Sequence, residues 1–219
     1  MAHKANGPRS DQSTHAAVDL PEGCPELPVL GVGVVRERAD AARNRVRVLA
    51  AAQRLFDERG VAAVTMDDVV AAAGVGKGTL FRRFKDKGGL AAALLDQHES
   101  ALQQQMLFGA PPLGPGAPAE KRLAAFVRAY LGYAQRQLDL LLMSETSSPG
   151  ARLRIGAHVL WRQHVALLLA ESGVEEPRLR ADVLMAALAA EQVSHWLRDQ
   201  HLDPDTLAGH LSAIALARG

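Results

Sequence analysis

The chain has 219 residues, a net charge of +1, 48% hydrophobic residues and 22% charged residues. This composition is typical of a soluble helical protein rich in Ala and Leu, and no apolar run reaches the roughly 18 residues that would predict a membrane span. The single cysteine, Cys24, excludes an intramolecular disulfide and fits a reducing cytoplasm, and the N-terminus lacks a signal-peptide pattern.

Positive charge is concentrated in one part of the chain. Residues 36–90 contain twelve Lys or Arg and seven Asp or Glu, whereas residues 1–35 and 91–219 each carry a net charge of −2. A polyanion such as DNA would therefore be attracted to the segment 36–90.

Residues 1–35 contain four prolines, several glycines and no sustained periodicity, which predicts a disordered N-terminal arm. Its basic residues Lys4 and Arg9 are of the type that enters a DNA minor groove. The plainer interpretation, an unstructured extension, is favoured because the arm is net acidic.

The first helix is predicted from about Arg38 to Arg59, with Val46, Leu49, Leu55 and Phe56 on one face. Gly60 supplies the left-handed position that ends a helix. Thr65 and Asp68 then form a capping pair for a second helix that runs to Ala73.

Gly74 ends the second helix, and Val75 is expected to fill the turn. A third helix is predicted over 77–84, with Leu80 and Phe84 facing inward. Three helices with a glycine-bounded turn before the last one are the pattern of a helix-turn-helix unit.

Asp86 opens a fourth helix that extends to about Leu107, and at about 1.5 Å per residue it is about 30 Å long, enough to connect two domains. The stretch 109–118, rich in Gly and Pro, predicts a loop. Further helices are predicted at 119–137, 150–172, 178–199 and 204–217, the last one opened by Asp203 and Pro204.

The third predicted helix has the side chains that a DNA-reading helix needs. Gly78 and Thr79 are small enough for close approach to the major groove, and Lys77, Arg82 and Arg83 are long enough to reach base edges or phosphates. At the starts of the neighbouring helices, Thr65 and Lys87 are placed to contact the two DNA backbones, which fixes the register on the duplex.

Residues 45–90 resemble the N-terminal domain of the TetR family of bacterial transcriptional regulators. The resemblance rests on "VLAAAQRLFDERG", on "VTMDDVVAAAGVGKGTLFRRF" and on "FKDKGGL". It implies an all-α fold with a three-helix DNA-binding domain at 36–88 and a larger helical ligand-binding and dimerisation domain at 89–219.

The resemblance also implies a set of DNA contacts. Phe81 stands where the family usually has a tyrosine, Arg83 where histidine is common, and Gly88 where an acidic residue is usual, which suggests a looser start of the fourth helix. The implied contacts are Thr65, Lys77, Gly78, Thr79, Phe81, Arg82, Arg83 and Lys87.

A palindromic DNA site is normally read by a two-fold dimer. The resemblance implies that the last two helices form the interface, while periodicity alone is equally consistent with monomer core. The candidate interface residues are Ala186, Ala190, Val193, Trp196, Leu197, Leu207, Leu211 and Ile214.

The resemblance further implies that a small molecule binds in the larger domain and changes the separation of the two DNA-binding heads. An Ala- and Leu-rich lining would suit an apolar or aromatic effector. The alternative for each position, ordinary core packing, is favoured at this stage. The candidate pocket residues are Met106, Phe126, Tyr130, Tyr133, Met143, His158, Trp161 and His164.

No enzyme is expected, because the sequence has no GxSxG, Walker-type or HExxH motif. No cofactor and no metal are expected either, since the six-residue spacing of His158 and His164 does not place both on one helical face. The leading hypothesis is a cytoplasmic, homodimeric repressor released from a palindromic operator by a small molecule. The alternative is a sequence-tolerant architectural DNA-binding protein without an effector.

Overall fold

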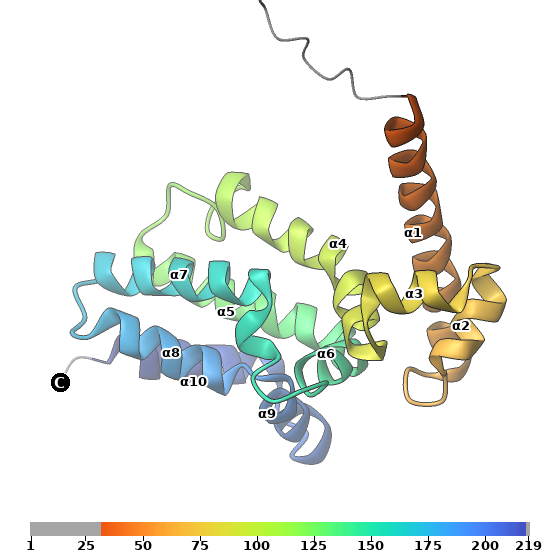
Figure 1. The fold of residues 1–219 in the computed structure, drawn as a ribbon. Helices are drawn as coiled ribbons and strands as arrows, with labels where there is room; N and C mark the ends of the chain where they lie inside the picture. Colours follow the sequence, from red (N-terminus) through yellow and green to blue (C-terminus); the bar gives the residue numbers. More distant parts are fainter. Residues whose placement is uncertain (1–31, 218–219) are drawn as a thin grey trace, which may run out of the picture. The chain divides into compact units, whose positions relative to one another are not determined.

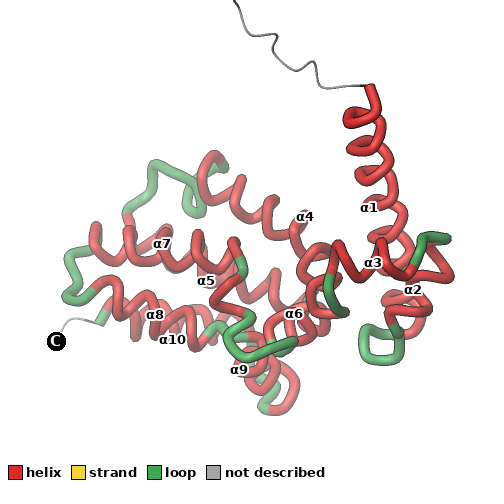
Figure 2. Tube along the Cα trace, in the orientation of Figure 1, coloured by secondary structure: helices red, strands yellow, loops and turns green. Residues whose placement is uncertain are grey.

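The computed structural model describes the backbone of residues 32–217 and the side chains of residues 40–217. The chain divides into two units, residues 1–40 and 41–219. The described residues form helices joined by loops, with no strand among them (Figure 2), as the all-α prediction requires. None of these helices is both long enough and apolar enough to cross a membrane.

The first four helices follow the predicted order (Figure 1). They are α1 (Val32–Arg59), α2 (Met66–Ala73), α3 (Lys77–Phe84) and α4 (Lys87–Phe108). Helix α1 begins six residues before the expected Arg38, so residues 32–35, assigned to the arm from sequence, belong to this helix. The rest of the predicted arm, including Lys4 and Arg9, lies outside the described residues.

Local capping explains where the short helices begin and end. The Thr65 hydroxyl accepts a hydrogen bond from the Asp68 amide, and the Thr65 amide donates to the Asp68 carboxylate, so the predicted capping box is present. Gly74 ends α2 in the left-handed conformation with φ of 60°. Asp86 caps α4 by accepting from the Gly89 amide.

Six further α-helices follow the loop at 109–118. They are α5 (Ala119–Arg136), α6 (Leu138–Glu145), α7 (Gly156–Glu171), α8 (Pro177–Ala187), α9 (Ala190–Ser194) and α10 (Pro204–Leu216). A 3-10 turn, η1 (Arg152–Arg154), precedes α7, and a π-helical turn, η2 (His195–Asp199), follows α9.

Two of these elements differ from the sequence predictions. Helix α6 was not predicted, and the helix expected at 178–199 is broken near Leu188 into α8, α9 and η2. At the break the Ala190 amide donates to the Glu145 carboxylate at 2.8 Å, so a residue of α6 caps α9. A long-range contact of this kind has no local sequence signal.

The core runs from Val48 to Ala215. Helix α5 packs against α7 and α10, α7 packs against α8, and α4 packs chiefly against α6. Phe126, Leu131, Leu168 and Leu169 are completely buried at the centre of the larger helical region. Because α4 continues from the α1–α3 core into this region, it connects the basic head to the rest of the fold.

Candidate nucleic-acid interface

Helix α3 presents a basic, solvent-exposed face. Its inward residues are Leu80 and Phe84, which are 1% and 4% exposed and pack into the core that α1, α2 and α4 share. This anchoring turns Lys77, Arg82 and Arg83 to solvent, with Gly78 exposed beside them. An eight-residue helix held by two core residues and showing cations on the other side has the form of a recognition helix.

Arg82 and Arg83 form no hydrogen bond or ion pair with any residue that the structure describes. Both guanidinium groups can therefore meet DNA without first losing an internal partner. Arginine binds phosphate oxygens and the guanine edge through paired donors, which makes these two residues the strongest candidates for direct contact.

The other predicted cations already have partners within the chain. The ammonium of Lys77 lies 2.8 Å from a carboxylate oxygen of Asp67 in α2 and 5.8 Å from the centroid of the Phe81 ring. The ammonium of Lys87 donates to the Ala62 carbonyl at 3.1 Å, and partial burial lowers its pKa. DNA phosphates must replace or share these partners.

Thr65 is also engaged, because its hydroxyl donates to the Asp68 carboxylate at 2.6 Å. That hydrogen bond and the cap hold the start of α2 in place. Together with the cap, the hydroxyl of Thr65 lowers the pKa of Asp68, so this carboxylate stays ionised near neutral pH.

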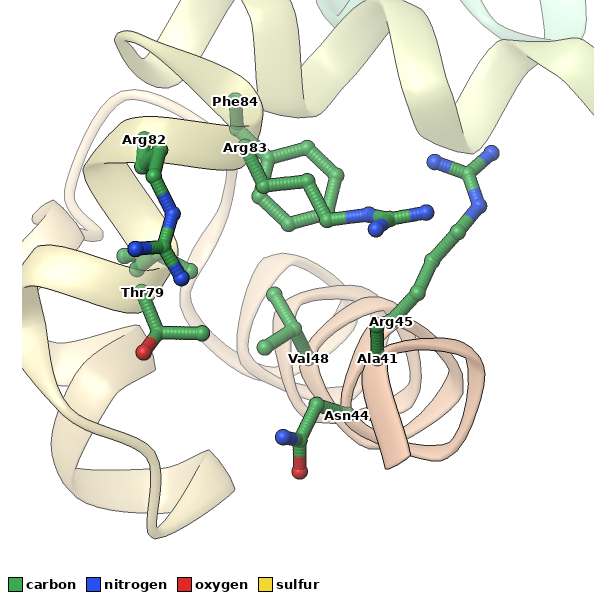
Figure 3. Close-up of a pocket in the computed structure, with 9 residues that line it drawn as sticks. Ala41, Asn44, Arg45, Val48, Thr79, Arg82, Arg83 and Phe84 are labelled. Carbon is green, nitrogen blue, oxygen red and sulfur yellow. The ribbon is translucent and has the colours of Figure 1, made fainter. Parts of the chain in front are cut away.

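A groove of about 350 Å³ lies between α1 and α3 (Figure 3). Thr79, Arg82 and Arg83 line it from α3, and Asn44 and Arg45 line it from α1. Figure 3 shows Arg83 and Arg45 extending from their two helices on the same side of the groove. The sequence analysis did not identify Asn44 or Arg45, although their Arg-rich context, RNRVR, is a basic signal.

Val46 is 67% exposed, contrary to its predicted place on the inner face of the first helix. The residues that α1 buries are Val48, Ala51, Ala52, Leu55 and Phe56. Because the turn from Val48 to Ala52 sets this inner face, Asn44 and Arg45 lie at its edge beside α3.

Comparison with known proteins supports this interpretation of the head. Residues 48–94 match the family model described as bacterial regulatory proteins, tetR family. HTH-type transcriptional regulators of Staphylococcus aureus strains USA300 and NCTC 8325 are 47% identical to this chain over 53 residues. The aligned segment spans 24% of this chain and 29% of the length of those relatives.

Solved structures extend the likeness to the whole fold. A TetR/AcrR-family regulator from Thermobifida fusca has a TM-score of 0.54 at 21% identity, covering 80% of this chain and 97% of its own. A TetR-family regulator from Pectobacterium atrosepticum has the same TM-score at 23% identity, covering 82% and 93%. Residues 48–94 thus match the N-terminal domain of the TetR family, and the chain shares its fold with these two solved structures.

Five of the predicted effector residues form one buried aromatic cluster. Phe126, Tyr130 and Tyr133 of α5 meet Trp161 and His164 of α7, with ring centroids 5.1 to 6.0 Å apart. Met106 is completely buried and Met143 is half-buried at the edge of the same core.

Several polar atoms in or beside this cluster have no hydrogen-bond partner among the described residues. They are Nδ1 of His158, Nε1 of Trp161 and Nε2 of His164. Burial lowers the pKa of both histidines to about 4, so both are neutral at physiological pH. Buried donors and acceptors without partners are costly, and a bound molecule could satisfy them.

The structure divides the predicted interface residues into two groups. Ala190 and Val193 are 2% and 0% exposed and belong to the core, and Trp196 and Leu197 pack against that core. Ile214 is 66% exposed and Ala186 is exposed. Leu207 is 7% exposed and also belongs to the core.

An apolar groove of about 270 Å³ lies between α8 and α10. Leu211 and Ile214 line it from α10, and Leu179, Val183 and Ala187 line it from α8. Leu179 and Val183 are 59% and 60% exposed. Neither residue was among the predicted interface residues, because the break that ends α8 at Ala187 was not predicted from sequence.

Proposed function

We propose that this protein is a dimeric transcriptional regulator that binds a palindromic operator through α3 and leaves it when a small molecule binds. The observation that carries the DNA-binding part is the exposed basic face of α3, with Arg82 and Arg83 unpaired within the described residues and Leu80 and Phe84 fixed in the core. Such a regulator acts in the cytoplasm, where the DNA is.

The dimer is proposed to form through the α8–α10 groove. Exposed leucine, valine and isoleucine side chains at positions 179, 183 and 214 form one apolar strip, and a second copy of the same strip would bury it by two-fold symmetry. A two-fold dimer would present two copies of α3, as an inverted repeat with half-sites about one helical turn apart requires.

Release by an effector is proposed from the path of α4. This helix begins at Lys87 beside the DNA-binding head and packs along α6 in the larger region. A molecule that separates α4 from its neighbours would therefore move the head. One structural relative is named as a repressor of a multidrug efflux pump, NalD of Pseudomonas aeruginosa, at 23% identity and a TM-score of 0.50.

The test is selection of duplexes from a random pool by the purified full chain at moderate salt, followed by sequencing. Enrichment of an inverted repeat supports a dimeric, sequence-specific regulator. Binding without enrichment supports the architectural alternative, which would read phosphates alone. Failure to bind any duplex, with and without candidate effectors, contradicts both.

A further inference from the structure

Glu99 is a buried acid without a cation. It lies in the middle of α4 and is 6% exposed, and its carboxylate accepts a hydrogen bond from the Tyr133 hydroxyl of α5 at 3.2 Å. No Lys, Arg or His among the described residues lies within ion-pair distance of it. Burial, and to a lesser extent the nearby carboxylates of Asp96 and Glu145, raises the pKa of Glu99 to about 7.

The second buried acid of this region already has its partners. Glu145 lies 3.0 Å from the guanidinium of Arg152 and accepts from the Ala190 amide. The same guanidinium donates to the Leu188 carbonyl at 3.1 Å. Arg152 thus forms an ion pair with Glu145 and not with Glu99. Burying an acid without a cation costs stability, so such a residue is a candidate for function.

Tyr133 connects Glu99 to the aromatic cluster of α5 and α7. Tyr133, which contacts Glu99, has its ring 5.9 Å from Tyr130 and 5.8 Å from Trp161. Organic cations are attracted to the faces of such rings and to carboxylates, and a site that offers both favours a cation over a neutral molecule. The nearby histidines, His158 and His164, are neutral and do not supply that charge.

A groove of about 370 Å³ lies between α4 and α5, and Tyr133 is the member of the cluster that lines it. Its lining is partly apolar, with Leu102 and Ala129 beside Tyr133, and partly polar, with His98, Gln105 and Gln137. This volume is in the range of small-molecule sites. Of the two arginines on the groove, Arg128 is paired with Asp205, and Arg136 is exposed to water, which screens its charge.

We propose that Glu99 is the counter-ion for a monovalent organic cation with an apolar or aromatic body, which enters through the α4–α5 groove and takes the place of the Tyr133 hydroxyl at the carboxylate. This inference rests on the proposed function, because it names the chemical class of the effector. Since Glu99 is part of α4, a ligand held there acts on the helix that begins at the DNA-binding head.

The test uses two ions of matched size and opposite charge, tetraphenylphosphonium and tetraphenylborate, with the smaller cation benzyltrimethylammonium. Binding to the full chain is measured by calorimetry and by quenching of Trp161 fluorescence in a Trp196→Phe background. The expected result is binding of at least one cation, no saturable binding of the anion, and a loss of cation affinity of about ten-fold or more in Glu99→Gln.

Glu171→Gln is the control, because Glu171 is an exposed acid at the end of α7. It should leave cation binding unchanged. Thermal unfolding followed by circular dichroism establishes that both variants are folded. Three results would overturn the proposal: binding of neither cation, equal binding of the anion, or full cation affinity in Glu99→Gln. A preference for the anion would point to Arg136 instead.

The inference and the proposed function can fail separately. If the chain binds a selected operator but neither cation, the proposed function stands and the assignment of Glu99 as a counter-ion is wrong. A chain that binds the cation through Glu99 but binds no DNA would show the reverse. If both hold, the cation should release the operator from the wild-type chain at concentrations that leave Glu99→Gln bound.

Discussion

Gly88 at the start of α4 lies so close to Ser147 that a Cβ atom added at Gly88 would fall 2.2 Å from the Cβ of Ser147 and 3.1 Å from the Met143 carbonyl oxygen. No real pair of side chains approaches this closely. The DNA-binding head and the end of α6 are therefore packed together at a position where only glycine fits. From sequence, Gly88 suggested a loose start of α4, and the structure contradicts that interpretation.

Gly88→Ala should push the first turn of α4 away from α6 and displace Lys87 with it. Overpacking of this kind typically costs about 1–3 kcal/mol, and we expect the free energy of unfolding to fall by that amount and operator affinity to fall as well. The measurements are chemical denaturation and a DNA titration. Gly209→Ala is the control, because nothing lies within 4 Å of the added Cβ in α10, so this variant should be at least as stable as wild type.

Asp67→Asn should strengthen DNA binding. The Asp67 carboxylate holds the ammonium of Lys77 at 2.8 Å and would itself repel phosphate. Because both side chains are largely exposed, we expect the affinity for DNA to rise about three- to ten-fold at low salt, and this increase should shrink as salt is added. Fluorescence anisotropy at several salt concentrations measures it. Weaker binding would show that Asp67 helps to position α3 instead.

Lys77→Ala and Thr79→Val should have different consequences. Loss of the Lys77 cation should weaken binding to all duplexes. It should also reduce the slope of log affinity against log salt concentration by about one, as expected for one lost phosphate contact. Thr79 lines the groove between α1 and α3 (Figure 3), and replacing its hydroxyl by a methyl group should change the order of preference among sites. If neither substitution changes binding, the placement of α3 on DNA is wrong.

The raised pKa of Glu99 predicts that the stability of the folded chain decreases as pH rises. Its pKa is raised to about 7 in the folded chain from 4.5, by burial first and by Asp96 and Glu145 next, against the Tyr133 hydrogen bond, which lowers it. The unfolded chain therefore loses this proton at lower pH than the folded chain does. The resulting decrease in the free energy of unfolding is absent below about pH 4.5, grows as pH rises, and is complete above pH 7.

Glu99→Gln should therefore stabilise the protein at pH 8 by about 2–3 kcal/mol and have little effect near pH 4.5. Denaturant unfolding of the wild-type and variant chains at both pH values checks this. An equal change at both pH values would show that the effect comes from packing and not from the charge.

Val183→Glu should convert the dimer to a monomer and weaken operator binding, because it places a charge on the apolar α8–α10 groove. Val159→Glu is a matched control, since Val159 is 44% exposed on α7 and outside that groove. Sedimentation at micromolar concentration distinguishes the two states. A dimer that survives Val183→Glu would place the interface elsewhere.

The caps and the short helices of the head could be predicted from sequence, because their signals are local. Thr65 with Asp68, Gly74 and Asp86 are caps that act within four residues, and α3 runs over the predicted 77–84. Helix α6 could not be predicted, because its sequence, LDLLLM, is almost continuously apolar and shows no helical periodicity. In addition, only one residue, Gln137, separates it from α5.

The functional surfaces of the larger region depend on contacts between distant segments. Glu145 and Arg152 hold the break at Leu188 through hydrogen bonds. That Glu99 has no such cation becomes clear only when Glu99, Glu145 and Arg152 are placed in one structure. Of the eight predicted pocket residues, Phe126, Tyr130, Tyr133, Trp161 and His164 contact one another through their rings, and their role in binding an effector stays a prediction. The apolar strip was only half identified, because the end of α8 was not visible in the sequence.

The most direct test of the central claim compares two proteins on one selected duplex. One is the wild-type chain and the other carries Lys77→Ala, Arg82→Ala and Arg83→Ala, which leave Leu80 and Phe84 in the core. We expect wild type to bind as two chains per duplex with a dissociation constant of about 10⁻⁸ M or tighter, and the variant to stay folded and dimeric but to lose affinity for the duplex. Equal affinity of the variant for the same duplex would contradict it.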